Sequence, residues 1–372
     1  LPGTDIEAAW AGQGGGGTSP AEGRASVDAL LEAGAAAIDA GAADAGLVSI
    51  RTAIALADEA GAADQQIAAR VALGEALIHS VRGRDEEGLG ALHTADAMAR
   101  TSGDSRAAAR IRTELGYVNF LRARYDRAVH WLSDALARAG DDPQVVGPAR
   151  AYLGSVESDR AEYTAALANL TEAADCARRV GATRQQAYAL SMIGRIHLLR
   201  GQTDDAIRVL REATGVCESD RWLSLLPWPQ ALLGEALLVG DDVESARGVL
   251  EQAFARACRL GDPCWEGTVA RALALVSEAR GDVEEAFMRL EDARVRGRRA
   301  GDPYVWLDAY ILDAMATLGV RHDHPQTAAW VGQLQSLAER ADMREMAVRA
   351  LVHGAQLGWP QRWGPRPRLT YC

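Results

Sequence analysis

The sequence predicts an all-α fold, a solenoid of about eight antiparallel helix pairs, and three observations support this prediction. Small residues recur at a spacing close to 40 residues, a period typical of repeat architectures. Within each unit, small and apolar residues follow at the spacing of a helix face. Sustained alternation of β-branched residues bounded by turns is not found, so we expect no strands. The recurring small residues are Gly34, Gly74, Gly116, Gly154, Gly194, Gly234, Ala274, Ala314 and Gly354.

Each unit is expected to contain two closely packed helices. In the first seven units the small residue is followed by Gly or Ala 12 positions later, Leu or Ile 16 later and Ala 19 later, with a two-residue delay in the second unit. The last three positions share one face of a helix. Gly inside a helix costs roughly 0.5–1 kcal/mol relative to Ala, so its repeated use indicates close helix approach. In the fifth unit these residues are Gly194, Ala206, Leu210 and Ala213, and the expected helices span about 184–200 and 203–218.

The turns between units carry helix-capping residues. Residues 261–263 and 301–303 both read Gly-Asp-Pro, which supplies a helix-ending Gly, an Asp N-cap and a Pro at the first helical position. The delay in the second unit places an insertion in the loop around Gly83 and Arg84. We therefore expect the helices after these turns to begin directly at Pro263 and Pro303.

Both ends depart from the repeat. Residues 1–23 are expected to form a flexible Gly-rich linker, 24–357 the superhelical domain and 358–372 a disordered tail. The linker has the Gly spacing of a phosphate-binding loop, but Thr18 stands where the Lys should be. Leu1 in place of an initiator Met leads us to expect further sequence upstream. A last single helix, about 343–357, is expected to cap the solenoid.

The repeat resembles the tetratricopeptide repeat in its order of small residue, Ala, large apolar residue and Ala. The signature also places Leu just before the Gly, a position held by Leu73, Leu115, Leu153, Ile193, Leu233 and Leu273. The signature's Trp and Pro are missing, and the unit has 40 residues rather than 34. The resemblance implies a right-handed superhelix with a concave groove lined by the first helix of each pair.

A second resemblance concerns the whole region. Ala-, Arg- and Leu-rich units that end in a Gly-Asp turn resemble the superhelical region of large actinobacterial transcriptional regulators, similar to the activator of the maltose regulon. In those proteins an ATPase module precedes the superhelix and a LuxR-type helix-turn-helix module follows it. This resemblance implies a sensor and coupling region of a regulator. A free-standing adaptor that binds a peptide segment is the alternative.

Charge and composition exclude several functions. All 40 basic residues are Arg, so Schiff-base chemistry and lysine bases are excluded within this sequence. The net charge of −11 would repel duplex nucleic acid, so we expect no direct nucleic-acid contact by this region. No run of 18 apolar residues and no signal peptide are found, which predicts a cytoplasmic protein without a membrane span.

Residues with reactive or metal-binding side chains form no recognised site. The histidines at 322 and 324 lack the further ligands of a zinc site, so a solvated loop is favoured over a metal site. The cysteines form no C-x-x-C pair, and those near the ends of second helices are expected to be buried at repeat seams; a redox or metal role is the alternative. We expect no catalytic residue, no metal and no cofactor, and hence a non-catalytic scaffold. The cysteines are Cys176, Cys217, Cys258, Cys264 and Cys372.

The register of the repeat selects a candidate groove. In tetratricopeptide-like pairs the exposed face of the first helix falls six and three residues before the small residue and one after it. The expected occupant is a protein or peptide segment or a small-molecule inducer, since aromatic residues and Arg are enriched at binding hot spots. Self-association is also possible. In the alternative reading, Tyr188 and Trp228 pack between neighbouring helices and Arg195 pairs with Glu235 at the surface. The selected residues are Arg110, Tyr117, Tyr188, Arg195, Trp228, Glu235 and Arg271.

Overall fold

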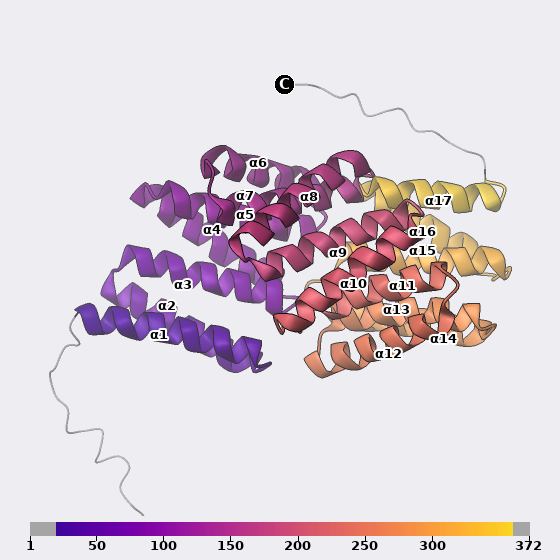
Figure 1. The fold of residues 1–372 in the computed structure, drawn as a ribbon, viewed down its shortest axis with the longest axis horizontal. Coiled ribbons are helices and arrows are strands. Elements are labelled where there is room, and N and C mark those ends of the chain that lie inside the picture. Colours follow the sequence, from indigo (N-terminus) through magenta and orange to yellow (C-terminus); the bar gives the residue numbers. More distant parts are fainter. Residues whose placement is uncertain (1–19, 360–372) are drawn as a thin grey trace, which may run out of the picture. The chain divides into compact units, whose positions relative to one another are not determined.

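The computed structural model describes residues 20–359, and these residues form α-helices, one short π-helical turn and no strand (Figure 1). The helices follow one another in antiparallel pairs, which confirms the predicted α-solenoid class. They are α1 Pro20–Asp39, α2 Ala43–Ala60, α3 Ala63–Glu75, the π-helical turn Ala76–Ser80, α4 Asp85–Ser102, α5 Ser105–Leu121, α6 Tyr125–Ala139, α7 Pro143–Asp159, α8 Tyr163–Val180, α9 Thr183–Leu199, α10 Thr203–Ser219, α11 Pro227–Val239, α12 Val243–Leu260, α13 Pro263–Ala279, α14 Val283–Gly297, α15 Val305–Arg321, α16 Thr327–Arg340 and α17 Arg344–Gln356.

The contacts divide the chain into two compact units, an N-terminal unit up to Leu73 and a main unit from Gly74 onward. In the N-terminal unit α1 and α2 lie close together because both carry Gly at the contact. A Cβ on Gly34 would lie 2.7 Å from Ile50 Cγ1, and one on Gly46 would lie 2.6 Å from Gly34 O. Its core is Val27, Ala53, Ala57 and Ala69. The single superhelical domain expected over 24–357 stays a prediction.

The same Gly contact repeats through the main unit. A Cβ on Gly194 would lie 2.5 Å from Leu210 Cγ, and one on Gly154 would lie 2.8 Å from Leu170 Cγ. In both pairs the leucine is the residue 16 positions after the Gly. The predicted packing rule is therefore confirmed, with the leucine side chain occupying the space that the glycine leaves open.

The helix boundaries of the fifth unit and of the last helix agree with the expectation to within one residue. The fifth unit consists of α9 Thr183–Leu199 and α10 Thr203–Ser219. Asp262 caps α13 by accepting hydrogen bonds from the amides of Cys264 (3.0 Å) and Trp265 (3.1 Å). The second Gly-Asp-Pro prediction was wrong, because α15 begins at Val305 after an N-cap at Tyr304. Asp302 makes a different contact instead.

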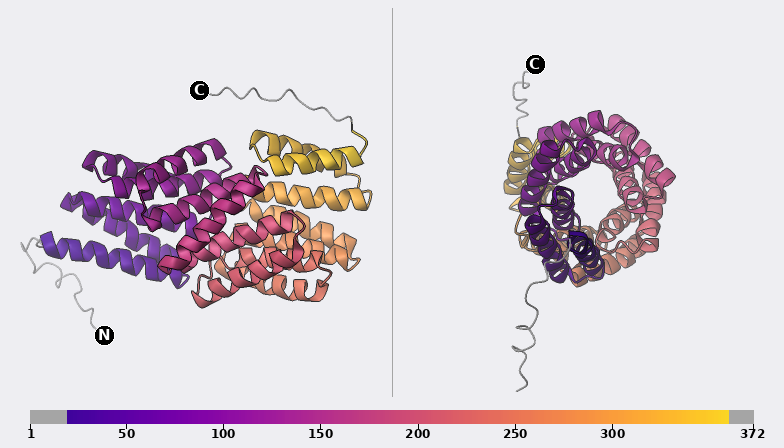
Figure 2. Two further views of the ribbon diagram at one scale, coloured as in Figure 1. Left: turned by 45° about the horizontal axis from the view of Figure 1, so that its top comes forward. Right: turned by 90° about the vertical axis from the view of Figure 1, so that its left-hand side faces the viewer.

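The main unit closes on itself at the loop around Gly83 and the segment before α15. Asp302 N donates to Gly83 O (3.0 Å), and Asp302 Oδ2 accepts from Glu86 N (3.0 Å). Tyr304 OH donates to Asp85 Oδ1 (3.0 Å) across 219 residues of sequence. The end-on view in Figure 2 shows helices of the main unit arranged in a ring. The insertion in the second unit thus forms one side of this closure.

The closure needs glycine at position 83. Its φ is +87°, in the left-handed region that favours glycine, and a Cβ there would lie 3.0 Å from Gly301 N. A larger residue would have to separate the two loops.

The start of the first helix and the exposure of one cysteine differ from the expectations. α1 begins at Pro20, so residues 20–23 are helical where a linker was expected. Cys372, residues 12–19 with the Gly spacing of a phosphate-binding loop, and most of the tail lie outside the described residues. Of the cysteines near the ends of second helices, Cys176 and Cys217 are buried but Cys258 is exposed, contrary to expectation. Cys258 follows the buried Ala257 by one position, which turns it about 100° away from the core.

The eighth unit keeps a packed helix despite its irregular pattern. Trp330 and Leu334 are buried, and the His324 ring stacks on Trp330 at 4.6 Å between centroids. Among the described residues, no group of three or more His, Cys, Asp and Glu is placed to hold a metal ion. No described helix is long and apolar enough to cross a membrane.

Candidate functional site

A cavity of about 290 Å³ lies inside the main unit. Its helical lining residues come from α5, α7, α9, α11, α13, α15 and α17, which are the first helices of the pairs from the third unit onward and the terminal helix. The second helices of the pairs contribute no residue to the lining. The wall of the cavity is therefore built by one helix from each successive repeat, starting with the third.

Six of the seven residues selected from the repeat register line this cavity. They are Tyr117, Tyr188, Arg195, Trp228, Glu235 and Arg271. Arg110 does not line it; this residue lies on the N-terminal half of α5 and is exposed, whereas α5 reaches the cavity through Tyr117, Phe120 and Leu121 near its other end. That these residues bind a ligand stays a prediction.

Aromatic rings form a continuous row across the cavity wall. Ring centroids are 5.7 Å apart for Tyr117 and Tyr188, and 5.9 Å for Tyr188 and Trp228. Trp228 and Trp265 stack at 6.0 Å with an interplanar angle of 13°, and Trp306 follows at 6.3 Å from Trp265. These spacings are those of favourable aromatic pairs. Tyr188 and Trp228 therefore pack against rings of neighbouring helices, as the alternative interpretation expected, and they also line the cavity.

Sequence reasoning missed the rest of the aromatic row. Trp265, Trp306 and Tyr310 stand nine, eight and four residues before their small residue, whereas the groove register assumed fixed offsets. Trp265 lies one helical turn before Thr268, which stands six residues before the small residue and also lines the cavity, so Trp265 is on the selected face but beyond the offsets that were used. Tyr310 stands four residues before Ala314, one residue away from the offset of three. The clustering of Trp and Tyr in first helices was the signal that could have found them.

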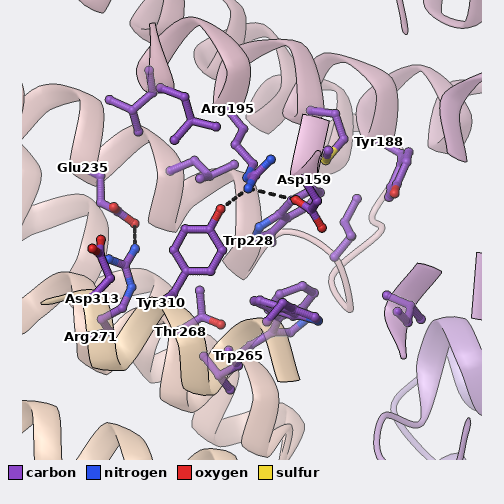
Figure 3. Close-up of a pocket in the computed structure, with 18 of the residues that line it drawn as sticks. Asp159, Tyr188, Arg195, Trp228, Glu235, Trp265, Thr268, Arg271, Tyr310 and Asp313 are labelled. Carbon is purple, nitrogen blue, oxygen red and sulfur yellow. Dashed lines mark hydrogen bonds and ion pairs between the residues drawn. The ribbon is translucent and has the colours of Figure 1, made fainter. Parts of the chain in front are cut away.

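Arg195 is the centre of a buried ionic network. Its Nη2 lies 3.0 Å from Asp159 Oδ1 and 3.1 Å from Glu345 Oε2, and its Nη1 donates to Ser158 Oγ at 2.6 Å. It also donates to the hydroxyl of Tyr310 (Figure 3). The side chain is only 7% exposed. The expected surface pair between Arg195 and Glu235 is therefore wrong, because the closure of the main unit brings Glu345 beside Arg195.

Burial and the neighbouring positive charges shift the pKa values of the acids in and beside this network in opposite directions. Burial raises the pKa of Asp159 and of Glu345, although the positive charge of Arg195 opposes the increase in both cases. Burial also acts to raise the pKa of Asp313, but the hydrogen bond from His353 and the charge of Arg349 outweigh it and lower this pKa.

The remaining charged residues of the cavity wall are also paired. Arg271 binds Glu235, and its guanidinium lies 5.5 Å from the ring centroid of Tyr310. Figure 3 shows Tyr310 between the side chains of Arg195 and Arg271.

Two further pairs complete the charged lining. Arg82 Nε lies 3.2 Å from Asp262 Oδ2, with its guanidinium 4.1 Å from the ring centroid of Trp265. Arg349 Nη1 lies 2.8 Å from Asp313 Oδ2. Every charged residue of the lining therefore has an oppositely charged partner, and these residues are Arg82, Asp159, Arg195, Glu235, Arg271, Asp313 and Arg349.

Comparison with known proteins agrees with this architecture. A family profile described as tetratricopeptide repeat matches residues 148–219, which span α7 to α10. No curated protein sequence matches the chain. The match to the repeat profile and the solved structures below identify the fold as a tetratricopeptide-like α-solenoid.

Three solved structures share the fold. A Rap protein complexed with Competence and Sporulation Factor is 13% identical, with a TM-score of 0.56 over 86% of this chain and 99% of its own. The Rap conjugation gene regulator of plasmid pLS20, in complex with the Phr* peptide, is 14% identical, with a TM-score of 0.53 over 89% and 96%. Aspartyl phosphate phosphatase F from Bacillus subtilis is 12% identical, with a TM-score of 0.51 over 93% and 92%.

Proposed function

We propose that the main unit is a binding scaffold that takes a peptide segment of a partner protein into its interior cavity. The observation that carries this proposal is the aromatic row, which extends from Tyr117 on α5 to Trp306 on α15 along one cavity wall. Aromatic residues and Arg dominate the energetics of protein-binding sites. The volume of about 290 Å³ is near the lower end for ligand pockets, which suits a short segment or a few side chains.

Two of the structurally similar proteins support a peptide as the ligand. One is complexed with Competence and Sporulation Factor and the other with the Phr* peptide. Solenoids of this kind present extended concave surfaces to their partners. A small-molecule inducer in the same cavity is the alternative ligand.

The proposed role is binding without turnover. A general base must be free to take a proton from its substrate. Asp159, the carboxylate nearest Arg195, instead accepts a hydrogen bond from Tyr125 at 2.9 Å and pairs with Arg195 at 3.0 Å. The other acids of the lining are held in ion pairs in the same way, which favours a recognition site over a catalytic one.

Within this proposal, the chain is the sensor and coupling region of a multidomain LuxR-type transcriptional regulator. The 40-residue units support it. The place of α17 also supports it, since Arg349 of this helix lines the cavity and Glu345 pairs with the lining residue Arg195, which gives ligand occupancy a path to the terminal helix. Recovery of the complete reading frame tests the assignment. An upstream ATPase module and a downstream helix-turn-helix module would support it, and their absence would favour a free-standing adaptor in which this region contacts only protein.

Selection of peptides tests the binding function directly. Random linear peptides displayed on phage would be selected for binding to the full chain. The affinities of the selected peptides would then be measured for the wild type and for a double variant that carries Tyr188→Ala and Trp228→Ala. We expect affinity to fall about tenfold or more in this double variant, while helical content by circular dichroism stays unchanged. Trp131→Ala is the matched control, because Trp131 is half-buried on α6 and outside the cavity. Selected peptides that bind the double variant as tightly as the wild type would refute the proposal.

A further inference from the structure

We propose that the cavity admits an uncharged group with a planar apolar ring and rejects the same group when it carries a carboxylate or an ammonium. This inference rests on the proposed binding function and specifies the chemistry of the segment that enters. It follows from two properties of the lining: the pairing of its charges and the positions its own guanidinium groups occupy on the aromatic rings.

The charges of the lining leave no partner for a charged ligand. Arg271 and Glu235 pair with each other on neighbouring first helices, and the side chains are 9% and 15% exposed. An anion that approached Arg271 would have to displace Glu235 or lie beside it. A displaced carboxylate would stay buried without a partner, and burial of an unpaired charge is strongly unfavourable.

The same argument applies to a cation near the opposite wall. Asp159 and Glu345 are the acids there, and Arg195 bridges them at 3.0 Å and 3.1 Å. A ligand ammonium would have to displace this guanidinium, which also donates to Ser158 Oγ and Tyr310. A single ammonium group cannot replace that planar set of donors.

Aromatic rings offer a second way to bind a cation, but the protein's own arginines already lie on two of the rings nearest the ionic network, Trp265 and Tyr310. Arg82 lies 4.1 Å from the ring centroid of Trp265, and Arg195 and Arg271 lie 5.4 Å and 5.5 Å from that of Tyr310. These distances are typical of cation–π contacts. A ligand cation on either ring would meet a guanidinium of the same sign at close range.

An apolar ring, by contrast, fits the remaining surface. Seven of the chain's aromatic residues line this cavity, although the whole sequence holds only 9 Trp, 8 Tyr and 3 Phe. Leucines and Met192 fill the wall between them. A further ring can extend the row in edge-to-face or offset geometry without breaking any ion pair.

A matched series of small probes tests the inference on the full chain. The probes are 3-phenylpropanamide, 3-phenylpropanoate and 3-phenylpropylammonium, which share the ring and differ in the charge of the end group. Dissociation constants would be measured at pH 7 by ligand-observed NMR titration. We expect the amide to bind about tenfold or more tightly than either ion, and Trp228→Ala to weaken the amide about tenfold while Trp131→Ala leaves it unchanged.

One substitution should invert the preference. Glu235→Gln removes the charge that pairs with Arg271, so 3-phenylpropanoate should gain about tenfold in affinity while the amide changes little. A folding defect would weaken all three probes and could not produce this gain. Glu284→Gln, at an exposed position of the first turn of α14, is the control and should leave the three constants unchanged.

The outcomes separate this inference from the proposed function. Binding of either ion to the wild type as tightly as the amide, with sensitivity to Trp228→Ala, would overturn the selectivity and leave the binding function standing. Failure of the amide to bind would also overturn the inference, whereas the peptide selection judges the binding function independently.

Discussion

Arg195 on α9 and Glu345 on α17 are separated by 150 residues in the sequence, yet their side chains form an ion pair of 3.1 Å inside the main unit. Both side chains are 7% exposed, so the pair is shielded from water. The pair holds the terminal helix beside the cavity, which Arg349 of the same helix lines. The closure of the solenoid and the composition of the cavity are therefore linked.

Replacement of Arg195 by Ala should destabilise the main unit. The carboxylates of Asp159 and Glu345 would stay buried without their shared partner, and loss of one member of a buried pair costs about 3–5 kcal/mol. Urea unfolding followed by circular dichroism measures the change. Arg208→Ala is the control, because its pair with Asp205 is 66% and 50% exposed and should contribute less than about 1 kcal/mol. Equal stabilities of the two variants would contradict this role for Arg195.

The contact between Asp85 and Tyr304 should make stability depend on pH. Burial raises the pKa of Asp85 from 3.8 to about 6, although the hydrogen bond from Tyr304 opposes the increase. The folded state therefore holds the proton more tightly than the unfolded state, so the closure should gain stability as pH falls from about 6 to about 4. The gain is at most about 3 kcal/mol.

Thermal unfolding of Asp85→Asn between pH 7.5 and pH 4 checks this dependence. The variant carries a neutral amide at every pH, so it should gain most over the wild type above pH 6 and lose that advantage near pH 4. Asp323→Asn, in an exposed loop, is the control and should follow the wild type. A constant difference between Asp85→Asn and the wild type would show that the Asp85 carboxyl does not titrate in this range.

The helix-packing rule predicts opposite effects for two Gly→Ala substitutions. Gly194→Ala places a Cβ 2.5 Å from Leu210 Cγ, and such overpacking should destabilise by about 1–3 kcal/mol. Gly215→Ala, inside α10, places its Cβ with no atom within 4 Å and should stabilise by about 0.5–1 kcal/mol through helix propensity. Chemical denaturation of both variants measures the two signs. Stabilisation by Gly194→Ala would mean that the two helices can separate at no cost.

The hydroxyl of Tyr304 should hold the closure together. It donates to Asp85 Oδ1 at 3.0 Å and accepts from Gly83 N at 3.2 Å, so Tyr304→Phe leaves two buried polar groups without a partner. We expect a loss of about 1–3 kcal/mol. Amide hydrogen exchange of Gly83 and Asp302 should accelerate in this variant, while amides in the middle of α9 keep their protection. Unchanged exchange at both amides would indicate that the backbone contact alone closes the loop.

The spacing of small and apolar residues predicted most of the helix packing, because each contact that it describes lies within one 40-residue repeat. Gly194 meets Leu210, 16 residues later, in a helix pair whose two helices follow directly in sequence. Such contacts depend only on helix geometry and on the size of two side chains. The N-cap at Asp262 was predicted on the same basis, whereas the one at Asp302 failed because this carboxylate bonds to Glu86, 216 residues away.

The cavity was predicted in part. The repeat register placed Tyr188, Trp228 and Arg271 on first helices, and these side chains do line the cavity. It missed Trp265, which lies one helical turn before the offsets used, and Tyr310, which stands four rather than three residues before Ala314. It also could not assign the partner of any arginine.

The amino-acid sequence alone therefore determined the helix pairs and their close packing, since these follow from spacings within one period. The side of each pair that faces inward was expected from the resemblance to the tetratricopeptide repeat. Only the tertiary structure decided which residues meet across the cavity. Small rotations between successive repeats add up over the main unit, and their sum brings Glu345 to Arg195 and Tyr304 to Asp85. No single repeat contains that sum, because it is a property of the whole superhelix.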